Sequence, residues 1–163
     1  MPKPAPSFIP HGMHTITPHL WFNGDCQKAI QFYQRAFDAE EVSLVYSEDK
    51  PQTVMHAMLK IGDSYLMMAD AWPDTSEQGP VKTTSVGIWL YVEDCDALFK
   101  QAVGQGCKVV MPLMDAFWGD RFAKVRDPFG HCWAIATYKL LMNEEEIKQA
   151  KEKWMQENKV DYC

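Results

Sequence analysis

The chain has 163 residues, of which 47% are hydrophobic and 23% charged, and its formal net charge at pH 7 is -6. This composition is that of an ordinary globular protein, long enough for one compact domain or for two small modules that share a core. Lysine and arginine are scattered along the chain and form no basic stripe, so we do not expect binding to nucleic acid. No apolar run approaches the roughly 20 residues that cross a bilayer, and we therefore expect no membrane partner.

The N-terminal segment and the cysteines bear on where the protein works. Segment 1–14 is rich in proline and lacks the apolar core of a signal peptide, so we expect a flexible arm. The chain contains 5 cysteines and no Cys-x-x-Cys pair. Together these features favour reduced thiols and a cytoplasmic protein.

Two halves of the chain repeat one order of predicted elements: a strand, a helix and three further strands. The spacing of apolar residues places the elements of the first half at 19–22, 27–37, 41–46, 53–61 and 64–70. The corresponding segments of the second half are 87–92, 96–103, 108–113, 117–126 and 131–138. The sequence therefore predicts an α+β fold of two βαβββ modules, 15–71 and 85–139, joined by a linker over 72–84.

Signals for helix ends frame the two predicted helices. Asp25 and Asp94 precede them, and an aspartate at this position can accept hydrogen bonds from the first backbone N–H groups. Gly104 and Gly106 are expected to end the second helix. Each helix carries one apolar stripe, formed in the first by Ala29, Ile30, Tyr33, Ala36 and Phe37 and in the second by Cys95, Leu98, Phe99, Ala102 and Val103.

Segment 140–163 predicts a C-terminal helix and tail. Asn143 and Glu146 have the spacing of a capping box, in which each side chain accepts a hydrogen bond from the backbone of the other residue. The helix has a narrow apolar face that includes Ile147 and Trp154. We expect this face to pack on the domain or on a second copy of the chain.

Several segments match a known family. They are Pro18–Cys26, Ala29–Phe37, Met55–Ser64, Leu66–Asp70, Phe117–Phe122, Asp127–His131 and Trp133. Over residues 15–138 the chain resembles the vicinal-oxygen-chelate or glyoxalase/bleomycin-resistance superfamily, and more narrowly its PhnB-like branch. The resemblance implies βαβββ modules whose sheets curl around a small-molecule cleft, usually in a homodimer. It does not name the reaction, because the superfamily includes metal-dependent isomerases, lyases and dioxygenases as well as metal-free drug-binding proteins.

The resemblance also implies where a metal ion would be held. Metalloenzymes of this superfamily take ligands from the first and last strands of each module, and the chemistry needs His, Glu or Gln there. These positions correspond to His19, to Leu66 or Met67, to Gly87, and to Ala134 or Ile135. Among them only His19 is a competent ligand, so we expect the usual metal site to be missing and no cofactor to be bound.

A rearranged site remains an alternative. His19, His56 and Asp70 lie on separate predicted strands and could meet in a cleft to hold a divalent metal ion. His56 could also act as a general base. The simpler interpretation makes His56 a hydrogen-bonded strand residue and lets Asp70 cap the turn that follows its strand.

A polar cluster at 117–121 is the second candidate. Arg121 could clamp an anionic or carbonyl group, and Trp118 could stack on a flat ligand. In the alternative, Asp120 and Arg121 form a salt bridge at a hairpin, and Trp118 belongs to the core.

Three functions stay open. The first is a metal-free protein that binds a small aromatic or polar molecule, in a pocket of Trp and Met residues with polar groups from the set His19, His56, Asp70, Trp118, Asp120 and Arg121. The second is a lyase, isomerase or dioxygenase-type enzyme that uses a rearranged metal site or His56. The third is an interaction module whose C-terminal helix docks a partner. Because three of the four usual ligand positions lack a donor, the sequence favours the first.

Overall fold

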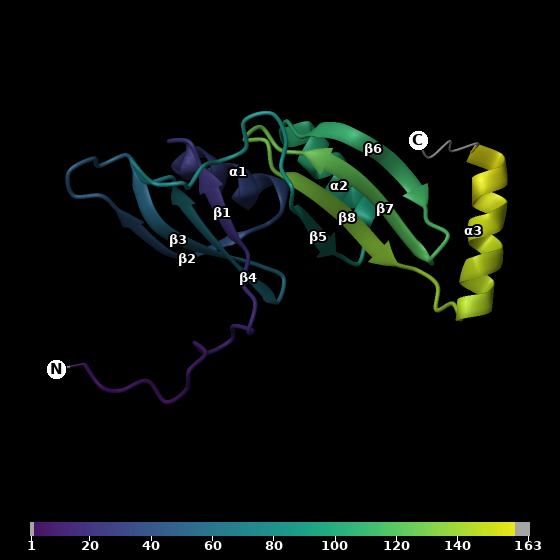
Figure 1. Ribbon diagram of the computed structural model, residues 1–163, viewed down its shortest axis with the longest axis horizontal. Helices are drawn as coiled ribbons and strands as arrows, with labels where there is room; N and C mark the ends of the chain where they lie inside the picture. Colours follow the sequence, from purple (N-terminus) through teal and green to yellow (C-terminus); the bar gives the residue numbers. More distant parts are fainter. Residues whose placement is uncertain (1, 159–163) are drawn as a thin grey trace. The chain divides into compact units, whose positions relative to one another are not determined.

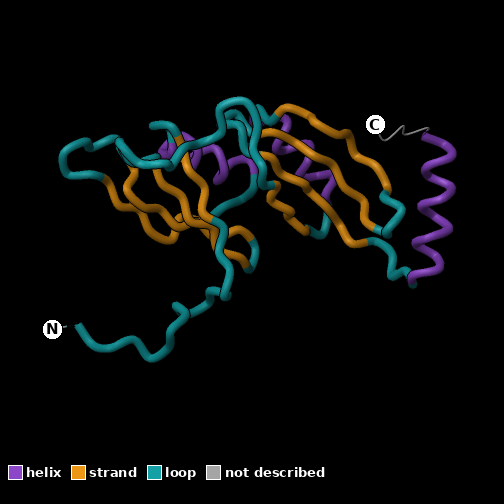
Figure 2. Tube along the Cα trace, viewed as in Figure 1, coloured by secondary structure: helices purple, strands orange, loops and turns teal. Residues whose placement is uncertain are grey.

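The computed structural model describes residues 2–158 of the chain (Figure 1). The chain divides into two compact units, Met1–Lys82 and Thr83–Cys163, and the division lies inside the segment 72–84 that has linker composition. Each unit contains one four-stranded sheet (Figure 2). None of the helices in the described residues is long and apolar enough to cross a membrane.

The first unit has the predicted strand, helix and three strands. They are β1 (His19–Phe22), α1 (Cys26–Ala36), β2 (Glu40–Tyr46), β3 (Val54–Ile61) and β4 (Ser64–Asp70). The strand order is β1-β4-β3-β2, with β1 parallel to β4 and the other neighbours antiparallel. A hairpin turn at Gly62, whose φ of 59° favours glycine, joins β3 to β4.

Alternation of side chains gives this first sheet two different faces. Ala57 and Leu59 of β3 are fully buried on the face that α1 covers. All five residues of the predicted stripe on this helix are buried, so that prediction is confirmed. His56 and Met58 lie on the opposite face and are only half-buried. We name this second surface the open face of the first sheet.

The start of α1 is held by a residue of β4. Asp25 makes no side-chain cap, so the prediction for this residue is wrong. Instead the carboxylate of Asp70 accepts hydrogen bonds from the backbone N–H groups of Gly24 and Cys26, at 3.0 Å each. A buried carboxylate thus satisfies backbone donors that a helix leaves without internal partners.

The second unit repeats the order and adds a helix. Its elements are β5 (Gly87–Tyr91), α2 (Cys95–Gln105), β6 (Lys108–Asp115), β7 (Asp120–Arg126), β8 (Cys132–Tyr138) and α3 (Glu144–Asn158). The strand order β5-β8-β7-β6 matches that of the first sheet. The predicted α+β fold of two βαβββ modules with a C-terminal helix is confirmed.

The ends of α2 fit the prediction only in part. Asp94 caps the helix by accepting a hydrogen bond from the Ala97 N–H at 3.0 Å, as expected. Thr137 of β8 accepts another from Cys95 N–H at 2.9 Å, in the place that Asp70 has in the first unit. Gly104 does not end the helix, which continues to Gln105 and stops at Gly106 with φ of 122°.

The segment 116–119 is a turn and not the predicted start of a strand. Gly119 has φ of 101°, and its carbonyl accepts hydrogen bonds from the N–H groups of Lys139 and Leu140. A Cβ atom on Gly119 would overlap the Leu140 carbonyl oxygen. This close contact requires a residue without a side chain. Strand β7 therefore starts after the turn, at Asp120.

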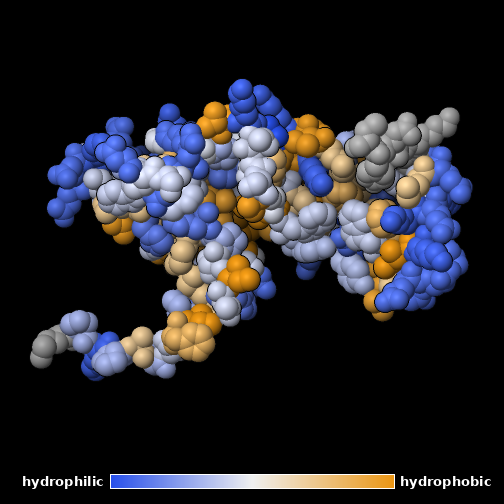
Figure 3. Space-filling model, in the orientation of Figure 1, coloured by the Kyte–Doolittle hydropathy of each residue, from blue (hydrophilic) through white to orange (hydrophobic). Residues whose placement is uncertain are grey.

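The capping box of α3 is confirmed. The Asn143 N–H donates to Glu146 Oε2 at 2.8 Å, and the Glu146 N–H donates to Asn143 Oδ1 at 3.0 Å. The ring of Trp154 lies 6.1 Å from that of Phe117, which places α3 beside the turn between β6 and β7 (Figure 1). The visible side of α3 is mostly hydrophilic (Figure 3).

Candidate functional site

The predicted trio of His19, His56 and Asp70 is divided between the two faces of the first sheet. His19 pairs with Met67 across the parallel β1–β4 ladder, and Phe22 pairs with Asp70. The two pairs are three residues apart, so their side chains point to opposite faces of the sheet. His19 and His56 therefore share the open face, and Asp70 points to the face that α1 covers. Within the described residues of either unit, no three His, Cys, Asp or Glu side chains are grouped to hold a metal ion, so the structure does not bring this trio together.

His19 lies at the β1 edge of the open face. Its ring packs against the indole of Trp21 with 4.2 Å between centroids. Desolvation lowers the pKa of His19, the nearby His56 lowers it further, and Glu77 opposes both effects. The side chain is therefore held toward its neutral form, in which one ring nitrogen can accept a hydrogen bond.

Asp70 serves the backbone. Its side chain is 3% exposed, and Oδ2 accepts from the Val54 N–H at 2.8 Å while Oδ1 accepts from Gly24 and Cys26. Burial raises the pKa of the Cys26 thiol, and the Asp70 charge adds to that shift. Asp70 thus joins the start of α1, β3 and β4 at one point.

The register of the parallel strands bears on the positions projected for the superfamily's metal ligands. His19 pairs with Met67 in the first unit, and the corresponding pair in the second unit is Gly87 with Cys132. Neither Ala134 nor Ile135 is the partner of Gly87, because the parallel register places Cys132 there. The four positions in this register thus hold His19, Met67, Gly87 and Cys132, and of these methionine and glycine supply no donor of the N or O type that the superfamily's metal takes.

Trp118 and Asp120 form a cluster with a residue that sequence reasoning missed. Asp120 is 2% exposed, and its Oδ2 accepts hydrogen bonds from Trp118 Nε1 and from the Tyr91 hydroxyl, at 2.8 Å each. The hydrogen bond to Asp120 raises the pKa of Tyr91. The alternation of side chains along β5 predicts that Tyr91 lies on the same face as Trp89. That Tyr91 meets Asp120 follows only from the registers of β5 with β8 and of β8 with β7.

Arg121 points away from this cluster. Its guanidinium donates to Asp96 of α2 at 2.6 and 2.8 Å and to Asp115 at 3.3 Å. These bonds raise the pKa of Arg121 and lower that of Asp96. The expected salt bridge with Asp120 is wrong, because neighbours on a strand face opposite sides. Arg121 fastens the sheet to α2.

The second sheet also has an open face, opposite the one that α2 covers. Trp89, 41% exposed, stacks on Phe122 with ring centroids 5.5 Å apart and an interplanar angle of 21°. Trp118 and Tyr91 flank it at 6.4 and 6.2 Å. A hollow of about 290 Å³ continues from Trp89 and is lined by Gly87, Val110, Lys124, Val125, Cys132, Trp133 and Ala134.

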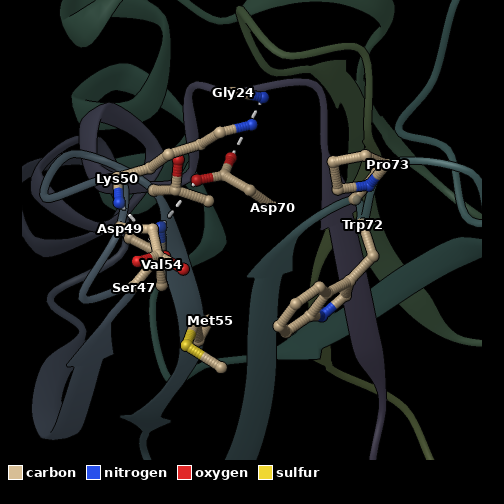
Figure 4. A pocket seen from close by; sticks show the side chains of 11 residues that line it. Gly24, Ser47, Asp49, Lys50, Val54, Met55, Asp70, Trp72 and Pro73 are labelled. Atoms are coloured by element: carbon tan, nitrogen blue, oxygen red, sulfur yellow. Dashed lines mark hydrogen bonds between the residues drawn. The ribbon is translucent and has the colours of Figure 1, made fainter.

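The first unit contains a larger pocket of about 390 Å³ (Figure 4). It lies where the β2–β3 loop, the start of α1 and the end of β4 meet the linker. Its lining residues are Gly24, Ser47, Asp49, Lys50, Thr53, Val54, Met55, Asp70, Ala71, Trp72 and Pro73. In this view Lys50 and Trp72 approach from opposite sides, with Asp70 between them and Met55 below. Neither His19 nor His56 is among these lining residues.

Sequence reasoning missed Lys50 and Trp72 as site residues. Both come from segments without regular structure, a hairpin loop and the linker, so no periodicity pointed to them. The one available signal was that a large aromatic residue stands in a stretch of otherwise polar and proline-rich composition. Among the lining residues, only Asp70 belongs to the predicted site residues.

Comparisons with known proteins agree with this fold. An uncharacterized protein of Mycobacterium bovis is 38% identical over 140 residues, which cover 83% of this chain and 90% of the relative. The solved structure of the PhnB protein of Bacillus cereus has a TM-score of 0.62 at 22% identity and covers 76% of this chain and 99% of that one. The fosfomycin resistance protein FosX of Listeria monocytogenes has a TM-score of 0.62 at 17% identity, with coverages of 82% and 97%. At these identities the two solved structures show the fold alone.

One family profile spans most of the chain. The profile of the Glyoxalase/Bleomycin resistance protein/Dioxygenase superfamily matches residues 13–135, which include both βαβββ units up to the last strand. This match and the two repeated units agree with the superfamily that the sequence motifs indicate. The chain belongs to the Glyoxalase/Bleomycin resistance protein/Dioxygenase superfamily.

Proposed function

We propose that this protein binds a small aromatic molecule that carries oxygen acceptors, and that it does so in the pocket of the first unit. The observation that supports the proposal most directly is the cavity of about 390 Å³ with Trp72 on one side and Lys50 on the other (Figure 4). Its size is typical of small-ligand sites, and such sites are mostly apolar with a few well-placed polar groups.

Trp72 provides the flat wall. Its side chain is 45% exposed, although large aromatic side chains are usually more deeply buried. Its backbone is held by Glu77, which accepts from the Trp72 N–H at 3.3 Å, and by Thr75, which donates to the Trp72 carbonyl at 2.9 Å. A wall whose main chain is fixed loses less conformational entropy when a ligand stacks on it.

Lys50 provides the donor. The Thr53 N–H donates to the Lys50 carbonyl at 2.8 Å, and the Lys50 N–H donates to Ser47 Oγ at 3.3 Å, so a tight turn presents the side chain. Its ammonium makes no ion pair with the described residues. Thr53 also lines the pocket, and a threonine hydroxyl can donate a hydrogen bond. The ligand should therefore carry acceptors opposite its ring.

The acids of the pocket affect this site less than their number suggests. Asp70 directs its charge at three backbone N–H groups, and those hydrogen bonds offset its field toward the cavity. Asp49 is exposed on the rim, where water screens its charge. We therefore propose that acceptor groups of the ligand face Lys50.

A thermal-shift screen of small aromatic acids, amides and phenols tests the proposal, followed by calorimetric titration of the best binder. Trp72→Ala and Lys50→Gln should each weaken that binder about tenfold or more. Trp89→Ala and Lys60→Gln, which lie outside the pocket, are matched controls and should leave the affinity unchanged. The proposal fails if no compound of the set stabilises the protein, or if the two pocket variants bind as tightly as the controls.

The superfamily resemblance further leads us to propose a homodimer. Sedimentation equilibrium should then give a mass twice the 18.7 kDa of the chain. A mass equal to that of a single chain across the micromolar range would contradict this assembly.

A further inference from the structure

We infer that Glu77 is a positioning residue for the proposed pocket, because its carboxylate fixes the segment that carries Trp72. We call this segment, residues 71–79, the strap. It follows β4 within the first unit and contributes Ala71, Trp72 and Pro73 to the lining of the pocket (Figure 4). The inference rests on the function proposed above and names the group that holds one wall of that site in place.

The strap begins and ends on the same short stretch of chain. The N–H of Ala71 donates to the Phe22 carbonyl at 2.7 Å. The N–H of Gly79 donates to Asn23 Oδ1 at 2.9 Å. Gly79 is buried, and a Cβ atom on it would lie 2.9 Å from the Trp21 carbonyl oxygen. Adjacent residues at the end of β1 therefore anchor both ends of the strap, and the residues between form a closed loop.

Glu77 closes this loop from within. Its Oε2 accepts a hydrogen bond from the Trp72 N–H at 3.3 Å and lies 3.3 Å from the Thr75 hydroxyl. That hydroxyl donates to the Trp72 carbonyl at 2.9 Å and accepts from the Glu77 N–H at 3.2 Å. Both polar groups of the Trp72 main chain are thus bonded to side chains of the strap, while the indole faces the pocket (Figure 4).

The strap needs such a restraint because it contains no helix or strand. Asp74 at its turn has φ of 61°, a conformation that residues other than glycine rarely adopt. A hydrogen bond that a carboxylate accepts is stronger than one between neutral groups. Without the Glu77 carboxylate, the Trp72 N–H would bond to water, and a ligand would have to order the strap as it binds.

Backbone hydrogen exchange and ¹⁵N heteronuclear NOE values of the full chain, without ligand, test the restraint itself. Glu77→Ala should speed exchange of the Trp72 amide about tenfold and lower the NOE values of the strap. Glu77→Gln should stay near the wild type, because an amide oxygen can still accept the Trp72 N–H. Ser76→Ala removes an exposed hydroxyl of the same strap and is the control that should change neither value.

Calorimetric titration with 2-naphthoate tests the consequence for the pocket. Glu77→Ala should weaken binding about fivefold, and Glu77→Gln should restore it. Trp72→Ala removes the wall but not the hydrogen bonds of its main chain. In the Trp72→Ala background, Glu77→Ala should therefore cost no further affinity. An equal loss in both backgrounds would overturn the inference, because Glu77 would then act through a group other than Trp72.

The two measurements separate this inference from the pocket proposal. If the wild type does not bind 2-naphthoate, the pocket proposal loses its support, whereas a loosened strap in Glu77→Ala with rescue in Glu77→Gln still supports the role of Glu77. Thr75→Val is the second variant if Glu77→Ala disturbs the fold, since it removes the hydroxyl bonded to the Trp72 carbonyl and should loosen the strap in the same direction. Exchange of the Trp72 amide at the wild-type rate in both variants would overturn the inference.

Discussion

Two buried aspartates hold parts of this fold in place through different kinds of hydrogen-bond donor. Asp70 and Asp120 are both nearly inaccessible carboxylates, but the first accepts only backbone N–H groups and the second only side-chain donors. The first is a structural residue shared by three elements. The second holds the aromatic side chains of Tyr91 and Trp118 in place on the second sheet.

Replacing Asp70 by asparagine should destabilise the protein by about 3 kcal/mol. In the wild type both carboxylate oxygens of Asp70 accept hydrogen bonds from backbone N–H groups. Asparagine keeps only one acceptor oxygen, and its NH₂ group would face a backbone N–H donor that then has no acceptor. Urea unfolding measures the change. Asp25→Asn is the control, since Asp25 makes no side-chain cap, and it should stay within about 0.5 kcal/mol of the wild type. Equal effects of the two variants would disprove the role given to Asp70.

His19 should make the protein less stable in mild acid. Its pKa is lowered in the folded state, so the unfolded chain takes up the proton first as pH falls through about 6.5. The contribution of His19 to the free energy of unfolding is therefore complete above that pH and is lost below it. His19→Gln should flatten the pH dependence between pH 7 and 5 relative to the wild type. A slope that is unchanged in this variant would contradict the assignment.

The elements show which parts of the fold a sequence can predict. The α1 stripe, the β4 bounds and the α3 capping box follow from local spacing, and the structure agrees with each. The cap of α1 does not follow, because its acceptor comes from β4, 44 residues away. Arg121 was grouped with its neighbours although strand alternation already separates it from Asp120. The pocket residues Lys50 and Trp72 are joined only by tertiary structure.

The turn between β6 and β7 should be the most sensitive glycine position of the second unit. Gly119→Ala combines a φ of 101° with overlap against the Leu140 carbonyl, so we expect a loss of about 2 to 4 kcal/mol. Gly62→Ala is the matched case, with φ of 59° and open space around the added carbon, and should cost about 1 kcal/mol. Thermal unfolding of both variants compares them directly, and a smaller loss for Gly119→Ala than for Gly62→Ala would contradict this account.

The whole molecule is a repeat in which corresponding positions have diverged. Asp70 and Thr137 hold equivalent helix starts with different chemistry, and His19 in the first unit corresponds to Gly87 in the second. The positions paired at the start of each parallel ladder hold His19 and Met67 in the first unit and Gly87 and Cys132 in the second, while each unit has a tryptophan and a lysine among the residues that line a hollow. Our proposal therefore assigns this chain a binding role that does not depend on a metal ion.

The measurement that tests this central claim most directly is an NMR titration of the tryptophan indole N–H signals in ¹⁵N-labelled protein. The chain has 6 tryptophans, and single Trp→Phe variants assign each signal. With the best binder from the aromatic screen, the Trp72 signal should shift in proportion to occupancy, whereas those of Trp133 and Trp154 should not move. The same result should persist after treatment of the protein with chelator. Binding that leaves Trp72 unmoved, or that vanishes when metal is removed, would contradict the account.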